Sequence, residues 1–101
     1  MIVALVRFPL DPPLSLDEGA KAFEQSAPSY QGLPGLLRKH YLLAPDGSVG
    51  GGVYLWASRA DAERFYDEAW RERLTKRYGS PPSLEYFESP VTVEPDAITT
   101  T

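Results

Sequence analysis

The segment Arg38-Lys39-His40 holds the residue types best suited to proton transfer and to stabilising negative charge. His40 is the only histidine, and an imidazole can take a phenolic or carbon-bound proton because its ordinary pKa is about 6.5. A neighbouring arginine could stabilise an enolate, a phenolate or superoxide as charge develops. His40 is therefore a candidate catalytic base and Arg38 a candidate substrate-binding residue. The alternative is that His40 is a half-exposed strand residue without a catalytic role.

Several aromatic residues in the second half of the sequence could form the walls of a pocket around such a base. Tyrosine and tryptophan combine an apolar ring with a polar tip, which suits flat apolar ligands. Side chains at these spacings also commonly form ordinary core. The candidate substrate-binding aromatic residues are Tyr54, Trp56, Tyr66, Trp70 and Tyr86.

Three consecutive glycines, Gly50 to Gly52, precede the apolar run Val53–Trp56. A phosphate-binding loop requires a Lys-Ser or Lys-Thr ending followed by a helix, whereas a strand is predicted here. We interpret Gly51 and Gly52 as clearance, either for His40 on the neighbouring strand or for a bound ring lying on the sheet. A bulge or a bend at the start of the strand is the alternative.

The composition excludes several kinds of chemistry and partner. The 101 residues contain no cysteine and one histidine, which argues against thiol nucleophiles, disulfides and multi-histidine metal sites, so we expect no metal. Ten basic and fourteen acidic residues give a net charge of -4, so neither nucleic acid nor an anionic membrane is an expected partner. The short apolar N-terminus resembles a strand rather than a signal peptide, and we expect a cytoplasmic protein.

Hydrophobic periodicity predicts the elements that must position these residues. Residues 2–8 form a strand, and a helix follows from a Ser15–Glu18 capping box to near Pro28. Residues 36–58 form a hairpin that turns at 44–48. A second helix runs from Ser58 to Gly79, and residues 83–94 form a last strand in which Pro90 requires an edge position or a bulge. Residues 96–101 are a loose tail.

The register of the hairpin decides which cation shares a face with Tyr54. A type I turn with a glycine bulge pairs Ala44 with Ser48, and this is the register we favour. It places His40 opposite Gly52, Arg38 opposite Tyr54 and Leu36 opposite Trp56. A slip of one residue would instead put Lys39 and Tyr41 on the face of Tyr54. In the favoured register Lys39 is a solvated cation near the sheet edge.

The order strand, helix, strand, strand, helix, strand predicts an α+β fold, a ferredoxin-like βαββαβ sandwich with a four-stranded antiparallel sheet. Residues 1–95 form this single domain. The strands carry apolar residues at both parities, so the face without helices needs a cover. A second copy of the chain is the simplest cover, which predicts a homodimer.

The hairpin sequence resembles the dimeric α/β-barrel superfamily, most closely its small monooxygenases of the YdhR type. The matching residues are Pro34, Gly35, Leu36, Leu37 and Lys39, followed by Gly51, Gly52, Val53, Tyr54, Leu55 and Trp56. The resemblance implies a homodimer whose two sheets form a barrel, with a ligand cavity between sheet and helices. It also implies cofactor-free oxidation of aromatic substrates. Arg38 and His40 lie outside the matched pattern, so the resemblance assigns them no role.

The resulting hypothesis is a cofactor-independent monooxygenase that acts on a small phenol or quinol in that cavity. One alternative is a non-catalytic dimeric protein that binds a hydrophobic metabolite, which solvent-facing Arg38 and His40 would favour. Another is an isomerase or dehydratase of a small acid, which requires a buried Arg38 to hold a carboxylate.

Overall fold

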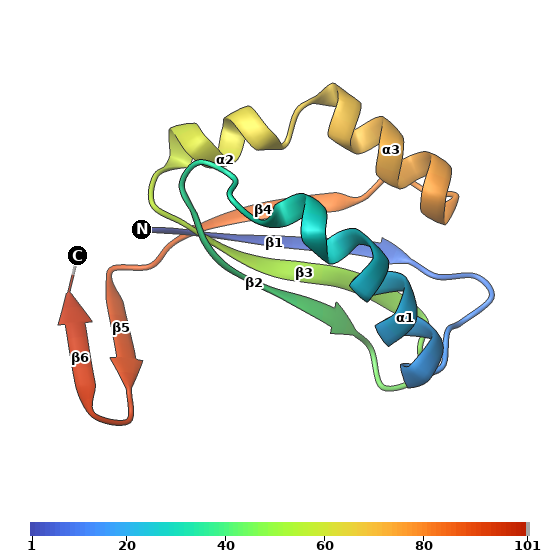
Figure 1. Cartoon of the computed structure of the whole chain (residues 1–101), viewed down its shortest axis with the longest axis horizontal. Helices are drawn as coiled ribbons and strands as arrows, with labels where there is room; N and C mark the ends of the chain where they lie inside the picture. Colours follow the sequence, from blue (N-terminus) through green and yellow to red (C-terminus); the bar gives the residue numbers. More distant parts are fainter. Residues whose placement is uncertain (101) are drawn as a thin grey trace.

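The computed structural model describes residues 1–100 and contains a four-stranded antiparallel sheet in the order β2-β3-β1-β4. The helices cover one face of this sheet and leave the other open (Figure 1). This is the predicted ferredoxin-like βαββαβ arrangement, and the predicted fold class is confirmed. The strands of the sheet are β1 (Ile2–Pro9), β2 (Leu36–Leu43), β3 (Val49–Trp56) and β4 (Ser83–Glu88).

The first helix, α1 (Leu16–Ser26), begins where the sequence predicts. The Ser15 side chain accepts a hydrogen bond from the backbone N–H of Glu18, and the Glu18 carboxylate accepts one from the N–H of Ser15. This capping box satisfies two N–H groups that the helix cannot pair internally. A 3-10 turn, η1 (Ala27–Tyr30), follows α1 and carries Tyr30 over the sheet.

The single long helix predicted from Ser58 to Gly79 is wrong, because the segment forms α2 (Arg59–Phe65) and α3 (Glu68–Tyr78). The apolar periodicity continues through both helices and therefore hides the break. At the break, the Asp67 side chain accepts a hydrogen bond from the N–H of Trp70 at 2.9 Å and caps a new helix. Ser58 caps α2 through the N–H of Asp61, as its position predicts.

The predicted last strand, residues 83–94, is also divided. It breaks at Ser89 and Pro90 into β4 and β5 (Val91–Glu94), because proline lacks the N–H that a continuous ladder needs. Residues 96–101 were expected to be a loose tail, but Ala97–Thr100 forms β6 and pairs with β5. Thr101 lies outside the described residues. Figure 1 shows this hairpin projecting away from the main sheet.

The hairpin of β2 and β3 adopts the alternative register, and the register favoured from the sequence is wrong except at the pair Leu36–Trp56. Ala44 donates its N–H to the carbonyl of Val49, so the loop is one residue longer than predicted. The Asp46 carboxylate organises this loop by accepting hydrogen bonds from the N–H and the hydroxyl of Ser48. Leu36 still pairs with Trp56, because a bulge at Leu37 absorbs the extra residue.

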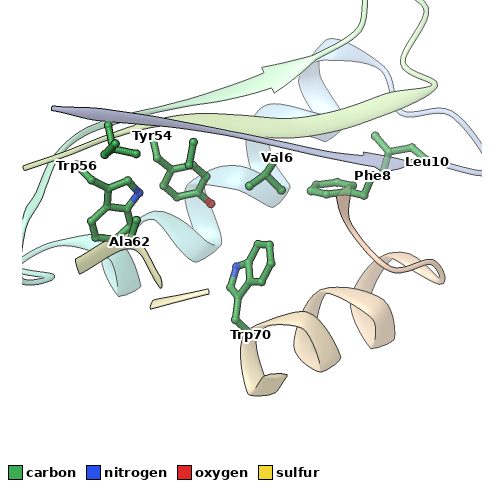
Figure 2. Packing of buried hydrophobic residues seen from close by; sticks show 9 residues of the cluster. Val6, Phe8, Leu10, Tyr54, Trp56, Ala62 and Trp70 are labelled. Carbon is green, nitrogen blue, oxygen red and sulfur yellow. The ribbon is translucent and has the colours of Figure 1, made fainter. Parts of the chain in front are cut away.

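The core lies between the sheet and the helices (Figure 2). Alternate residues of β1 point into it, which is the period-two pattern of a strand with one covered face. Trp70 points from α3 toward the sheet, opposite side chains of β3 and β1. The largest fully buried side chains are Trp56, Trp70 and Val6.

Candidate functional site

The observed register places Lys39 and Tyr41 on the helix-covered face of β2 and leaves Arg38 and His40 exposed on the other. Lys39 lies directly opposite Tyr54, the position that the favoured register gave to Arg38. His40 therefore does not share a face with Tyr54 in the protomer. Its candidate role as a base is unsupported by this placement and remains a prediction.

Lys39 is a largely buried cation without a carboxylate partner among the ion pairs of residues 1–100. Its Nζ lies 3.3 Å from the ring centroid of Tyr30, 3.8 Å from that of Tyr41 and 4.6 Å from that of Tyr54. Burial lowers the pKa of Lys39 to about 7, whereas the three ring faces favour the charged form. The opposing effects make a neutral amine accessible near physiological pH, which an exposed lysine does not offer.

Hollows adjoin this lysine along the edge between the sheet and α1, η1 and α3. Tyr30, Lys39 and Tyr41 line both an open hollow of about 290 Å³ and a narrower one of about 50 Å³ that reaches Tyr54. Tyr30 also borders a third hollow, of about 370 Å³, which Trp70 lines as well. We call these three hollows together the helix-side site. The first and third hollows, of about 290 and 370 Å³, lie near the lower end of the range for small-molecule pockets, whereas the second is too small to hold a ring.

The predicted aromatic residues divide between this site and the core. Tyr54 and Trp70 line the helix-side site. Trp56 lies fully buried and donates its Nε1–H to the hydroxyl of Tyr66 at 3.1 Å. Tyr66 packs edge-on against Trp70 at 4.8 Å, and Tyr86 lies beneath the guanidinium of Arg59. Trp56, Tyr66 and Tyr86 therefore support the site by packing.

Burial raises the pKa of the Tyr54 hydroxyl and of the Tyr66 hydroxyl far above the ordinary value. The pKa of Tyr41 is raised as well, again mainly by burial, while its hydroxyl lies 2.6 Å from the Ser26 hydroxyl. These phenols stay protonated at physiological pH. They can donate hydrogen bonds to a ligand, but they cannot act as bases.

The glycine run provides clearance for the protein itself. A Cβ on Gly51 would overlap the backbone carbonyl of Val6, and one on Gly50 would lie 2.7 Å from the Phe8 ring. A Cβ on Gly52 would lie 3.1 Å from the Tyr54 ring and 3.2 Å from Cε of Lys39. Gly52 therefore makes room for the stem of Lys39, and Gly51 allows close approach of β1.

Sequence reasoning missed three features of the helix-side site: the role of Lys39, the ring of Tyr30 and the arginines of α3. Lys39 belonged to the matched hairpin pattern, and the alternative register already placed it beside Tyr41 and Tyr54. The matched pattern and the alternative register together could have identified Lys39 from the sequence. Arg73 and Arg77 had no distinguishing signal, because they resemble the other charged residues of an amphipathic helix.

A family model described as "Putative mono-oxygenase ydhR" matches residues 3–82. The chain belongs to the ydhR family. The matched region contains the whole helix-side site of this ydhR-family chain, and the family description supports a monooxygenase function. No curated protein matches the sequence significantly.

Two solved structures share the fold of this ydhR-family chain. One is a monooxygenase from the gene ActVA-Orf6 of Streptomyces coelicolor in complex with the ligand nanaomycin D. It has a TM-score of 0.69 and 19% identity, and the match covers 94% of this chain and 92% of that one. The other is the NE2512 protein of unknown function from Nitrosomonas europaea, with a TM-score of 0.67, 17% identity and 95% of each chain covered. At these identities the likeness shows the fold.

No helix among residues 1–100 is long and apolar enough to cross a membrane. The same residues contain no group of three or more His, Cys, Asp or Glu side chains placed to hold a metal ion.

Proposed function

We propose that this protein is a cofactor-independent monooxygenase that oxidises a small phenol or quinol bound in the helix-side site. The observation that carries the proposal is the Lys39 amine, which lies against the rings of Tyr30, Tyr41 and Tyr54 and lines an open hollow of about 290 Å³. Membership of the ydhR family supports the oxidative chemistry. The ligand in the ActVA-Orf6 structure supports a place for a small molecule in this fold.

Lys39 acts as the base in this proposal. A buried amine with a pKa of about 7 is partly neutral at physiological pH and can accept the proton of a phenol in contact with it. The ammonium that forms then stabilises the phenolate, and the surrounding ring faces stabilise the ammonium. Deprotonation makes the aromatic ring electron-rich enough to reduce dioxygen.

Oxidation then proceeds without an external reductant. The phenolate gives one electron to dioxygen, and the resulting radical and superoxide combine to form a carbon–oxygen bond and a peroxide. Loss of water from the peroxide leaves a quinone carbonyl. All four electrons come from the substrate, so that a phenol and dioxygen yield a quinone and water. The protein holds the ring, takes the first proton and keeps bulk water away from the intermediates.

The test is oxygen uptake with a panel of hydroquinones and polycyclic phenols, corrected for autoxidation without protein. Lys39→Met keeps an unbranched apolar stem and removes the amine, and it should lower the rate roughly 100-fold or more. His40→Ala, on the open face, should leave the rate within about twofold. The wild-type rate should rise with pH around a midpoint near 7, because the neutral amine is the active form.

Three results would contradict parts of this proposal. An unchanged rate in Lys39→Met removes Lys39 as the base, and a large loss in His40→Ala restores the histidine. No uptake above autoxidation with any member of the panel rejects the oxygenase function.

We also propose that the protein is a homodimer that pairs the open faces of its sheets. This face exposes apolar side chains that a soluble protomer would otherwise leave in water. Leu37 is 54% exposed, Phe87 49% and Leu42 39%. The projecting hairpin adds Val93 and Ile98, each more than 70% exposed, and an isolated two-stranded hairpin gains little stability alone. A second copy of the chain would cover both features.

A second candidate function is a non-catalytic protein that binds a hydrophobic metabolite. The observation that favours it is the exposure of both Arg38 and His40, which leaves the predicted base outside the helix-side site. The third candidate, an isomerase or dehydratase of a small acid, loses support because it needs Arg38 buried. Ligand binding without oxygen uptake in the test above would favour the binding protein.

A further inference from the structure

Every charged side chain that lines the helix-side site is a cation. Lys39 lines the first hollow, where the neighbouring Arg38 of the open face also reaches the rim; Lys39 and Arg77 line the second, and Arg73 and Arg77 the third. No aspartate or glutamate lines any of the three. The chain as a whole has fourteen acidic and ten basic residues, so the sign of the charge at the site is opposite to that of the protein. A local field of this kind attracts anions.

The two arginines of the third hollow follow one another on α3 at a spacing of four residues, which places them on the same side of the helix. Neither takes part in the ion pairs found among residues 1–100, which join Arg7 to Glu85, Arg59 to Glu63 and Arg64 to Asp61. Arg77 donates one hydrogen bond to the carbonyl of Ala22 at 3.2 Å. The remaining guanidinium donors are available to a ligand.

A buried donor lies one turn before Arg73. The Trp70 side chain is 1% exposed, and its Nε1–H has no hydrogen-bond partner among residues 1–100. Trp70 lines the same hollow as Arg73 and Arg77, and its indole points from α3 toward the sheet (Figure 2). An unpaired buried donor costs about 1–3 kcal/mol, and an acceptor atom on a ligand would remove that cost.

We propose that the substrate is an aromatic carboxylate: Arg73 and Arg77 bind the carboxylate in the third hollow, and the Trp70 Nε1–H donates to a ring oxygen of the same molecule. This inference rests on the proposed function and specifies its substrate class. Both arginines are exposed and the indole is buried, so the same hollow offers charge to a carboxylate and a hydrogen-bond donor to an uncharged oxygen.

Binding is measured by calorimetry, without turnover and under argon, with 6-hydroxy-2-naphthoate and its methyl ester as a matched pair. The carboxylate should bind the wild type at least tenfold more tightly than the ester. Added salt should weaken the binding of the carboxylate and leave the binding of the ester unchanged. Arg73→Gln should reduce this preference about tenfold. Lys76→Gln removes a charge of the same sign from the same helix at a position that does not line the hollow, and it should leave the preference unchanged.

Trp70→Phe keeps an aromatic ring and removes the N–H. This substitution should weaken the binding of 6-hydroxy-2-naphthoate. It should not weaken the binding of 2-naphthoate, which lacks the ring hydroxyl. Arg77→Gln should reduce the carboxylate preference as Arg73→Gln does, and Arg77→Lys, which keeps the charge, replaces it if loss of the bond to Ala22 unfolds the Gln variant. Equal binding of acid and ester, or an equal effect of Arg73→Gln and Lys76→Gln, overturns the inference.

Failure of the inference and failure of the proposed function give different results. A carboxylate preference that depends on Arg73, without oxygen uptake from any phenol, supports the anion site and rejects the oxygenase. Oxygen uptake that is as fast with the ester as with the acid supports the oxygenase and rejects the anion site.

Discussion

The two faces of β2 carry the same kinds of side chain in opposite environments. On the helix side, Lys39 lies among tyrosine rings, and burial lowers its pKa to about 7. On the open side, Arg38 and His40 lie in solvent. The two sets are neighbours in sequence, and one residue of register would exchange them. The loop at Pro45–Ser48 sets the register, so its length decides which of these side chains lie under the helices and which lie in solvent.

The open face should control assembly, and the helix side should not. We expect Leu42→Glu to reduce the mass measured by light scattering from about twice 11.2 kDa to that of the monomer, because a carboxylate would be buried between two sheets. Ala69→Glu places the same charge on exposed α3 and should leave the dimer intact. A wild-type protein of monomeric mass would show that the open face has no such partner.

The glycines of β3 should differ by face in the same way. Gly51→Ala places a methyl group against the backbone carbonyl of Val6, which cannot move without shifting β1, and should lower the free energy of unfolding by roughly 3 kcal/mol. Gly52→Ala meets the Tyr54 ring at 3.1 Å and the flexible stem of Lys39 at 3.2 Å, which are longer distances than at Gly51, and should cost less. Urea denaturation of both variants measures the difference. Equal losses of stability would mean that the backbone at Val6 moves aside as easily as the side chains of Tyr54 and Lys39.

The buried amine should make stability depend on pH. Below pH 7 Lys39 is charged in both the folded and the unfolded chain, so the cost of burying the ammonium is fully present. As pH rises from about 7 toward 10.5 the folded protein binds fewer protons than the unfolded chain, and the cost disappears.

Lys39→Met should therefore raise the free energy of unfolding by roughly 1–3 kcal/mol at pH 6.5, since the ring faces offset part of the burial cost. The gain should shrink at pH 9.5. Denaturation at the two pH values measures it, with Lys76→Met as the exposed control. A variant no more stable than wild type at pH 6.5 would show that the tyrosine faces outweigh burial.

The smallest effect concerns the cap that separates α2 from α3 and so positions Trp70. Asp67→Ala removes the acceptor for the N–H of Trp70 and should cost about 1 kcal/mol in thermal or urea unfolding. Asp67→Asn keeps an acceptor and should retain most of the stability. If both variants behave alike, the charge beside the helix N-terminus matters more than the hydrogen bond.

Local sequence signals determined the architecture. Alternating apolar residues in β1, the Ser15–Glu18 capping box and the turn residues before Val49 each depend on contacts within a few residues. Their order along the chain was enough to predict the ferredoxin-like sheet. The Pro-Gly and Gly-Gly pattern of the hairpin was likewise enough to indicate the ydhR family, to which the chain belongs.

Tertiary structure decided the site. The sequence alone allowed two hairpin registers, and the choice depends on the Asp46 loop and on the bulge at Leu37. The position of Trp70 depends on a helix break that the unbroken apolar periodicity concealed. The cationic hollow joins Lys39 of β2 with Arg77 of α3, which are distant in sequence. Charge and burial at such a place arise from packing between elements, and no local pattern encodes them.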